Sequence, residues 1–327
     1  MTPSATASSV AGLDFSDPEL ERDVRGGLAA VERLLRESVT SDYPFVTETS
    51  RHLLDAGGKR FRPLVVLLAA QFGHSKAQGV VPSAVAIELT HLSTLYHDDV
   101  MDEADLRRGA VSANSRWTNT IAILTGDFLF ARASELTADL GTDATRILAQ
   151  TIAVLCEGQI RETVGPGDGP PVEHYLQVIA EKTGSLIATS GRLGALLSGA
   201  APEVVAALTE YGSRIGVAFQ LSDDMLDLTS ESVDSGKTPG TDLREGISTL
   251  PVLYAVQEGF EVPADLSDDA VLAATLAGLR IHPALERARQ VLADEAEAAR
   301  RCLSGLPDVP ARAALETLCD FVVARTG

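Results

Sequence analysis

Cysteine and aromatic residues are scarce in this chain of 327 residues, and each shortage excludes a class of protein. The three cysteines, Cys156, Cys302 and Cys319, are scattered without the spacing of a metal site or a disulfide framework. An odd number of cysteines with no export signal is typical of the reducing cytoplasm, where we place the protein. Aromatic residues make up 5% of the chain, while alanine, leucine and valine dominate, which favours packed helices over an aromatic-rich β-sandwich.

Positive charge and long apolar runs are scarce too. The formal net charge is -19 and the pI is near 4.7, which argues against nucleic acid or an anionic membrane as the main electrostatic partner. Apolar runs such as residues 63–70 fall far short of the roughly 20 residues that a membrane-spanning helix needs. A soluble protein is therefore expected, and an anionic substrate must be bound by a local basic cluster or by a metal ion.

What the chain does contain indicates one large helical domain. Hydrophobic residues make up 45% of it without a break in composition, and no stretch shows convincing strand alternation. We predict a disordered tail over residues 1–14 and one domain over residues 15–327. Helical periodicity predicts helices over residues 18–39, 44–55, 61–72, 81–105, 116–139, 142–163, 172–199, 203–228, 248–258, 268–278, 283–304 and 310–325. Glycine and proline clusters break the pattern at residues 57–58, 165–171 and 235–240, and we expect a plain loop at the second.

Two acidic stretches repeat one spacing, Asp-Asp-x-x-Asp, at residues 98–102 and 223–227. On a helix, residues four apart share a face, so Asp98 lies with Asp102 and Asp223 with Asp227. Pairs of carboxylates suit Mg²⁺, which is held by one or two carboxylates, by waters and by substrate phosphate oxygens. The repetition predicts two facing pairs that bind one diphosphate through magnesium across an apolar cavity.

An isolated acidic cluster is more often a helix cap or a solvated surface. Here apolar helical residues precede both stretches, at positions 87, 89, 92 and 95 and at positions 215, 217, 219 and 221. A row of carboxylates at the end of an apolar helix is typical of the border of a cavity.

Lysine occurs at only four positions, and three of them lie at candidate ligand sites. A compact ammonium is hard to replace by a planar guanidinium where the contact is a point charge on a phosphate. We therefore predict that Lys59, Lys182 and Lys237 contact a ligand. Lys76, in a turn rich in glycine and glutamine, is predicted to be exposed to solvent.

An ordered set of motifs runs along nearly the whole chain after the N-terminal tail. It comprises Gly57-Gly58-Lys59-Arg60-Phe61-Arg62-Pro63, His91, His97 to Asp102, Arg107-Arg108-Gly109, Gly126-Asp127-Phe128-Leu129, Lys182-Thr183-Gly184, Phe219 to Asp227, Gly236-Lys237, Asp242-Leu243, Glu245-Gly246 and Thr249-Leu250-Pro251. In this set the chain resembles the trans-isoprenyl diphosphate synthases, the polyprenyl synthetase family, of the long-chain type. The paired aspartate motifs with the Arg-Arg-Gly tail are the most specific part of the resemblance.

The resemblance implies an all-α, single-domain isoprenoid-synthase bundle of helices around a deep central cavity, usually in a homodimer. It implies a prenyltransferase that condenses an allylic diphosphate with successive isopentenyl diphosphates, with two or three Mg²⁺ ions as the cofactor. Partners would be these two substrates, without nucleic acid and without a transmembrane segment. The product would be delivered to a membrane, for example as the side chain of menaquinone.

The resemblance also implies a role for individual residues. Principal Mg²⁺ ligands would be Asp98, Asp102 and Asp223, with Asp99, Asp224 and Asp227 as direct or water-mediated partners. Isopentenyl diphosphate would be bound by Lys59, Arg62, His91 and Arg108. The allylic substrate would be bound by Arg107, Lys182, Thr183, Gln220 and Lys237. The catalytic set, which stabilises the leaving diphosphate, would be Asp98, Asp102, Lys182, Asp223 and Lys237. Two positions depart from the family pattern, because Ile247 replaces a frequent lysine and Gln159 a frequent glutamate.

Some of these positions have a second interpretation. His91 precedes Asp98 by seven residues and shares its helical stripe, but a lone histidine on an apolar helix is often a core residue. Tyr96 is expected to pack in the core. The Arg107-Arg108 pair could instead be a solvated helix end, although its closeness to the acids favours phosphate.

Small residues precede the first acidic stretch and indicate a long product. Short-chain relatives carry a bulky aromatic about one helical turn, on the order of 5 Å, below the first aspartate, where this chain has Ser93 and Thr94. The alternatives are a farnesyl or geranylgeranyl diphosphate synthase, a class I terpene cyclase and a non-catalytic partner subunit. A cyclase usually has a different second metal motif and lacks counterparts of Lys59 and Arg62.

Overall fold

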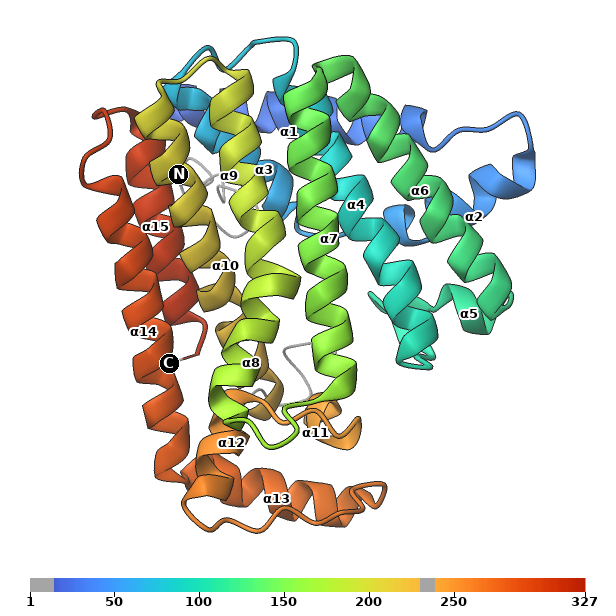
Figure 1. The fold of residues 1–327 in the computed structure, drawn as a ribbon, viewed down its shortest axis with the longest axis vertical. Coiled ribbons are helices and arrows are strands. Elements are labelled where there is room, and N and C mark those ends of the chain that lie inside the picture. The colour runs from blue at the N-terminus through green and yellow to red at the C-terminus, as the bar shows by residue number, and fades with distance from the viewer. Residues whose placement is uncertain (1–14, 230–238, 327) are drawn as a thin grey trace, which may run out of the picture. The chain divides into compact units, whose positions relative to one another are not determined.

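The computed structural model describes residues 15–229 and 239–326. Over these residues the regular structure is helical apart from one short two-stranded hairpin, so the predicted all-α class is confirmed (Figure 1). The chain divides into two compact units. The first comprises the described parts of Met1–Gln150 with Thr189–Thr209 and Gly305–Leu318, and the second comprises those of Thr151–Ala188, Glu210–Ser304 and Cys319–Gly327.

The first unit contains the helices of the N-terminal half of the chain. These are α1 (Pro18–Ser38), α2 (Pro44–Asp55), α3 (Phe61–Ala69), the short 3₁₀ turn η1 (Ala70–Phe72), α4 (Val80–Met101), α5 (Ala113–Arg116) and α6 (Asn119–Leu140). Helix α1 begins where the Asp17 carboxylate accepts the backbone N–H groups of Glu19 and Leu20, at 3.0 and 2.7 Å, with Pro18 in the first turn. This arrangement satisfies N–H groups that a helix start otherwise leaves unpaired.

Helix α4 is the core of the first unit. It packs against α1, α3 and α6, and its side chains are buried on most of its circumference from Val80 to Leu92. At its C-terminal end, Gly126 of α6 leaves room for the ring of His97, with which a β-carbon at position 126 would collide. The close approach of α4 and α6 therefore explains the glycine of the Gly-Asp-Phe-Leu motif, and it places the first acidic stretch at the end of a buried helix.

The second unit contains α8 (Pro171–Ile179), the π-helical turn η2 (Ala180–Gly184), α11 (Thr241–Arg244), α12 (Leu250–Gln257), α13 (Asp269–Ile281) and α14 (Pro283–Leu303). Helix α12 packs against α8 and α14. The unit boundaries fall within α7 (Thr142–Val164), α9 (Ser185–Leu197), α10 (Pro202–Thr229) and α15 (Pro310–Ala324).

Glycines bring α10 close to η2 and to the first turn of α9 within the second unit. A β-carbon added at Gly216 would lie 2.8 Å from Gly184 Cα, and one added at Gly212 would lie 2.6 Å from the Ile187 carbonyl oxygen. Only residues without a side chain allow this approach. It places Lys182 and Thr183, which lie in η2, beside the helix that carries the second acidic stretch.

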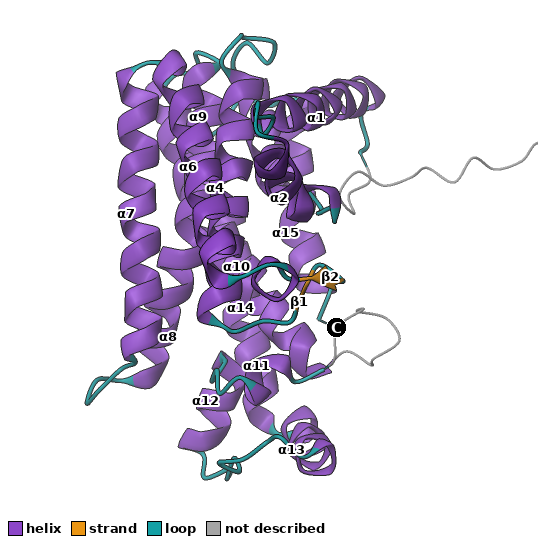
Figure 2. Ribbon diagram, turned by 90° about the vertical axis from the view of Figure 1, so that its right-hand side faces the viewer, coloured by secondary structure: helices purple, strands orange, loops and turns teal. Residues whose placement is uncertain are grey.

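The helices predicted from periodicity are all present, with three differences of detail. The predicted helix 172–199 is interrupted by η2, and the predicted helix 81–105 ends at Met101. Strands β1 (Leu106–Arg107) and β2 (Ala110–Val111) form an antiparallel hairpin that the sequence did not predict (Figure 2). Residues 165–170 form the expected loop. No helix among the described residues has the length and apolar character to span a bilayer.

Candidate active site

The first acidic stretch closes α4, and its three aspartates have different surroundings. Asp102 is the C-cap residue, and its backbone N–H still bonds to the Asp98 carbonyl at 2.8 Å. Asp98 is half-buried, and the side chain of Asp102 is 40% exposed. Asp99 is fully buried and accepts a hydrogen bond of 2.5 Å from Arg107 Nε, while its Oδ2 atom has no hydrogen-bond partner. The stretch thus presents Asp98 and Asp102, and holds Asp99 inside.

Arg107 bridges the buried and the exposed acids. Its second contact is to Asp102 Oδ2, at 3.5 Å from Nη2. Burial raises the pKa of Asp99, and the Arg107 guanidinium opposes that shift. The ion pair therefore keeps Arg107 over the end of α4.

The β1–β2 hairpin directs both arginines of the Arg-Arg-Gly motif. Arg107 pairs with Ala110, and the turn between them contains Arg108 and Gly109, which have φ values of 55° and 75°. Two successive residues with positive φ make a tight hairpin turn whose twist matches that of the strands. Arg108 Nη1 then donates hydrogen bonds to the carbonyl oxygens of Leu53, at 3.2 Å, and Gly57.

The charges of four arginines act on His91. The ring is half-buried on α4, and its burial is the largest cause that lowers its pKa well below the usual range. The positive charges of Arg62, Arg108, Arg60 and Arg107 lower it further, in that order. The imidazole is therefore neutral near pH 7 and can both donate and accept a hydrogen bond.

The Gly57-Gly58 loop completes the basic cluster of the first unit. Lys59 is exposed, Arg62 is half-buried in the first turn of α3, and Arg60 between them is buried. Lys76 is not part of this cluster. Its side chain is 75% exposed and lies 3.4 Å from Asp23, which confirms the prediction that it is exposed to solvent.

In the second unit, Asp224 is buried in a hydrogen-bonded chain. Tyr175 Oη donates to Asp224 Oδ2, Gln220 Nε2 donates to Oδ1 at 2.7 Å, and Thr183 Oγ1 donates to Gln220 Oε1 at 2.9 Å. Burial raises the pKa of Asp224 to about 6, although the bonds from Tyr175 and Gln220 act against the shift. The chain fixes the predicted residues Thr183 and Gln220 to one another and to the second acidic stretch.

The other two aspartates of this stretch have cationic or backbone partners. Asp223 Oδ1 accepts a hydrogen bond of 2.5 Å from Arg325. Asp227 accepts the backbone N–H groups of Thr241, at 3.2 Å, and Asp242, at 3.1 Å. These amides lie in the first turn of α11, after Gly240 with a φ of 78°.

Two lysines, Lys182 and Lys237, are expected near the second stretch, and the structure describes the first of them. Lys182 forms an ion pair with Glu162 of α7, within the second unit. Lys237 lies outside the described residues.

The donor set at both stretches fits a magnesium ion that shares its coordination shell with a substrate. Among residues 15–229 and 239–326, no group of three or more histidine, cysteine, aspartate or glutamate side chains could hold a metal alone. Mg²⁺ commonly takes one or two carboxylates and completes its octahedron with water and phosphate oxygens. The buried, unpartnered Oδ2 of Asp99 is a further oxygen acceptor at the first stretch.

Sequence reasoning missed several residues that hold the predicted ones. Each of them makes a contact between distant parts of the chain. Tyr175 bonds to Asp224, and Arg325 bonds to Asp223. Glu162 bonds to Lys182, and Arg60, next to Lys59, bonds to Glu88. No local spacing in the sequence predicts these contacts. Only Arg60 lay within a recognised motif. Tyr96 was predicted correctly to pack in the core, since it is fully buried and its hydroxyl donates to the Thr49 carbonyl.

Comparison with known proteins identifies the family. The chain matches the polyprenyl synthetase family over residues 43–273. It belongs to this family. It is 48% identical to nonaprenyl diphosphate synthase of Mycobacterium tuberculosis, over 98% of this chain and 99% of that protein.

Solved structures agree with this family. The geranylgeranyl pyrophosphate synthase of Corynebacterium glutamicum, complexed with calcium and isoprenyl diphosphate, is 45% identical and has a TM-score of 0.86, with 96% of this chain and 100% of that chain covered. The decaprenyl diphosphate synthase of Rhodobacter capsulatus is 35% identical with the same TM-score, with 94% and 99% covered. Polyprenyl synthetases that are similar to this chain thus differ widely in product length.

Proposed function

We propose that this protein is an Mg²⁺-dependent all-trans polyprenyl diphosphate synthase. It would condense an allylic diphosphate with successive isopentenyl diphosphates and release a long-chain product for a quinone side chain. Membership of the polyprenyl synthetase family makes the chain a prenyltransferase. The observation that carries the full proposal is the joint presence of two aspartate stretches and a cluster of arginines around a neutral His91.

The basic cluster of the first unit would bind isopentenyl diphosphate. Lys59, Arg62 and Arg108 supply positive charge, and His91 supplies a neutral donor among them. A diphosphate bound by several fixed donors brings its double bond to a defined position, which lowers the entropic cost of the reaction. Support comes from the positive charges of Arg62 and Arg108, which help to lower the pKa of His91.

The acidic stretches would bind the allylic diphosphate through magnesium. Asp98, Asp102 and Asp223 are proposed as ligands, with Asp227 as a further ligand and with Asp99 and Asp224 acting from buried positions. Bound Mg²⁺ supplies positive charge that neutralises the leaving diphosphate. Arg107, Lys182, Lys237, Thr183 and Gln220 are proposed to bind the same group.

The protein's own part in the reaction is electrostatic and steric. When the allylic carbon–oxygen bond breaks, negative charge accumulates on the diphosphate, and fixed cationic groups such as Arg107 stabilise it without reorganisation. An apolar cavity would keep water from the allylic cation. The new carbon chain then loses a proton, for which the departing diphosphate is proposed as the acceptor.

The long-chain product rests on the residues before the first stretch. Thr94 is half-buried one turn before Asp98, and Ser93 is buried beside it. Neither is large enough to stop a growing chain. A geranylgeranyl product is the second candidate, because a geranylgeranyl pyrophosphate synthase is 45% identical to this chain.

We further propose a cytoplasmic homodimer. Helix α6 carries the exposed apolar side chains Ile123, Leu124 and Phe130, which are 42%, 58% and 37% exposed. Large apolar side chains gathered on one exposed helix commonly mark a surface that a partner covers. A second copy of this chain is the partner that we expect.

One incubation tests the reaction. The purified protein is supplied with Mg²⁺, isopentenyl diphosphate and, in separate reactions, dimethylallyl, geranyl, farnesyl or geranylgeranyl diphosphate, and the products are sized by mass spectrometry. Linear products longer than geranylgeranyl are expected. Cyclic hydrocarbons without incorporation of isopentenyl diphosphate would indicate a terpene cyclase, and complete inactivity of the folded protein would indicate a silent partner subunit.

A further inference from the structure

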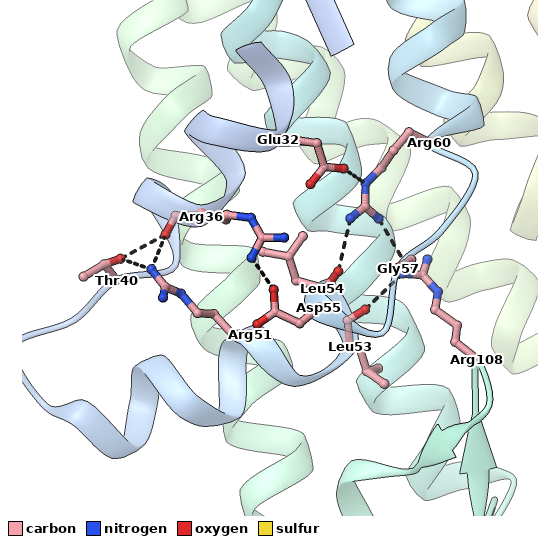
Figure 3. Close-up of polar contacts among 10 residues, drawn as sticks. All are labelled: Glu32, Arg36, Thr40, Arg51, Leu53, Leu54, Asp55, Gly57, Arg60 and Arg108. Carbon is pink, nitrogen blue, oxygen red and sulfur yellow. Dashed lines mark hydrogen bonds and ion pairs between the residues drawn. The ribbon is translucent and has the colours of Figure 1, made fainter. Parts of the chain in front are cut away.

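Arg60 anchors the loop that carries Lys59. Its side chain is buried and donates hydrogen bonds to Glu32 of α1, to the Leu54 carbonyl of α2 at 3.2 Å and to the Gly57 carbonyl at 3.5 Å (Figure 3). A fourth hydrogen bond, of 3.0 Å, joins it to Glu88 of α4. Glu88 is itself only 2% exposed. One guanidinium thus joins three helices to the loop.

The backbone of the loop needs such an anchor. Arg60 has a φ of 51° and a ψ of 36°, in the left-handed region that residues with a β-carbon rarely adopt, and Gly57 and Gly58 before it also have positive φ. A non-glycine residue keeps this conformation only where surrounding contacts fix it. As a consequence, the two neighbouring side chains point into different surroundings, because Arg60 is buried and Lys59 is exposed.

Arg108 holds the same loop through a second guanidinium. It donates to the carbonyl oxygens of Leu53 and Gly57, so Gly57 accepts from both arginines (Figure 3). A β-carbon at Gly58 would lie 2.9 Å from Arg60 Nη1 and 3.1 Å from Arg108 Cζ. The glycine therefore allows two cations to approach the loop backbone closely.

The charge of Arg60 is already balanced. Two carboxylates, those of Glu32 and Glu88, contact its guanidinium, and they raise its pKa although burial, the largest contribution, acts to lower it. A guanidinium paired with two carboxylates has little positive charge to offer a diphosphate. Its loss should change the shape of the loop more than the charge of the site.

We propose that Arg60 is a positioning residue for isopentenyl diphosphate. By fixing the loop between α2 and α3, it sets the place of Lys59 relative to Arg62 and Arg108. This proposal rests on the proposed function, because it assigns the loop to the isopentenyl diphosphate site. It adds a network of ion pairs, from the half-buried Glu32 through the buried Arg60 to the buried Glu88, on which the binding of that substrate depends.

The test removes the anchor without leaving a buried charge. Arg60→Met alone would strand Glu88 and could unfold the protein, so the variant is Arg60→Met/Glu88→Met, in which both members of the buried pair become apolar. With an allylic primer at saturation, we expect KM for isopentenyl diphosphate to rise about tenfold or more, while KM for the primer changes less than about twofold. Calorimetric titration with isopentenyl diphosphate in the absence of primer should show the same loss of affinity.

A mutant cycle with Lys59 distinguishes a positioning role of Arg60 from a general loss of structure. In the wild type, Lys59→Ala should weaken isopentenyl diphosphate binding about tenfold, whereas in the Arg60→Met/Glu88→Met background it should add less than about twofold, because Lys59 is no longer held in place. The matched control is Arg36→Gln/Asp55→Asn, which removes an exposed ion pair near the same loop (Figure 3). This control should leave both KM values unchanged.

The outcomes are distinct for the two proposals. If the wild type elongates prenyl chains but the folded double variant keeps its KM and the full Lys59→Ala effect, Arg60 is not a positioning residue. If the wild type does not elongate at all, the proposed function itself fails.

Discussion

Arg325 and Asp223 form an ion pair within the second unit, with 2.5 Å between Nη2 and Oδ1. The Arg325 side chain is 14% exposed, and its guanidinium lies over the rings of Phe219 and Phe321, 5.0 and 5.7 Å from their centroids. Its Nη1 atom is buried without a hydrogen-bond partner. A residue near the C-terminus thus places a cation on the first aspartate of the second acidic stretch, in an arrangement that leaves one donor unsatisfied.

A metal ion at Asp223 should therefore compete with Arg325. We expect Arg325→Gln to bind Mg²⁺ in the presence of inorganic pyrophosphate about three- to tenfold more tightly, or by about 0.6–1.4 kcal/mol, because a neighbouring positive charge is removed. Isothermal titration calorimetry measures this affinity directly. Arg300→Gln, which removes a cation paired with Asp320 instead, is the matched control and should not change it. Weaker binding by Arg325→Gln would mean that the arginine supports the metal site.

The fold was largely predictable from the sequence, whereas the contacts that hold the site were not. Periodicity located the helices because each buries an apolar stripe, and α4 ends at its acidic stretch as expected within a few residues. The β1–β2 hairpin was missed because two-residue strands are too short for alternation to show. The partners of Asp223 and Asp224, Arg325 and Tyr175, are 102 and 49 residues away, and only the folded chain brings them together.

Asp224 should give metal-free stability an unusual pH dependence. Its pKa is about 6 in the folded protein, against an ordinary value of 3.8. Between these pH values the folded state keeps a proton that the unfolded chain has lost, so the free energy of unfolding should fall as pH rises. The total contribution is about 3 kcal/mol, from roughly two pKa units at 1.36 kcal/mol each.

Urea unfolding in the presence of a chelator, repeated from pH 4 to pH 7, measures this contribution. The difference in unfolding free energy between wild type and Asp224→Asn should change by about 2 kcal/mol across that range, the part of the total that falls above pH 4, because asparagine cannot titrate. Asp139→Asn, at an exposed position of α6, is the control and should keep the wild-type pH profile. A pH-independent difference for Asp224→Asn would show that this carboxyl is ionised throughout.

The exposed apolar side chains of α6 indicate where a substitution should separate the subunits of the proposed homodimer. Leu124 is 58% exposed, and a glutamate there would place a charge in the proposed homodimer interface. Leu124→Glu should shift the protein from dimer to monomer in analytical ultracentrifugation at micromolar concentration, because an unpaired charge in an apolar interface costs several kcal/mol, on the order of 2–5. Glu135→Gln, an exposed change elsewhere on α6, should remain dimeric. A wild type that sediments as a monomer would contradict the proposed interface.

Thr94 offers the sharpest test of product length. It lies half-buried one helical turn before Asp98 on α4, and its hydroxyl donates a hydrogen bond to the His91 carbonyl at 2.8 Å. Thr94→Phe adds a rigid ring about one turn, or roughly 5 Å, below Asp98, where a lengthening prenyl chain would meet it. We expect products shorter by several isoprene units, with the rate of the first condensation within about threefold of wild type, since no diphosphate contact is lost. Thr94→Val, which keeps the shape of threonine, should give the wild-type product distribution. Mass spectrometry of the products decides the matter, because an unchanged distribution from Thr94→Phe would place the chain-length limit on another helix.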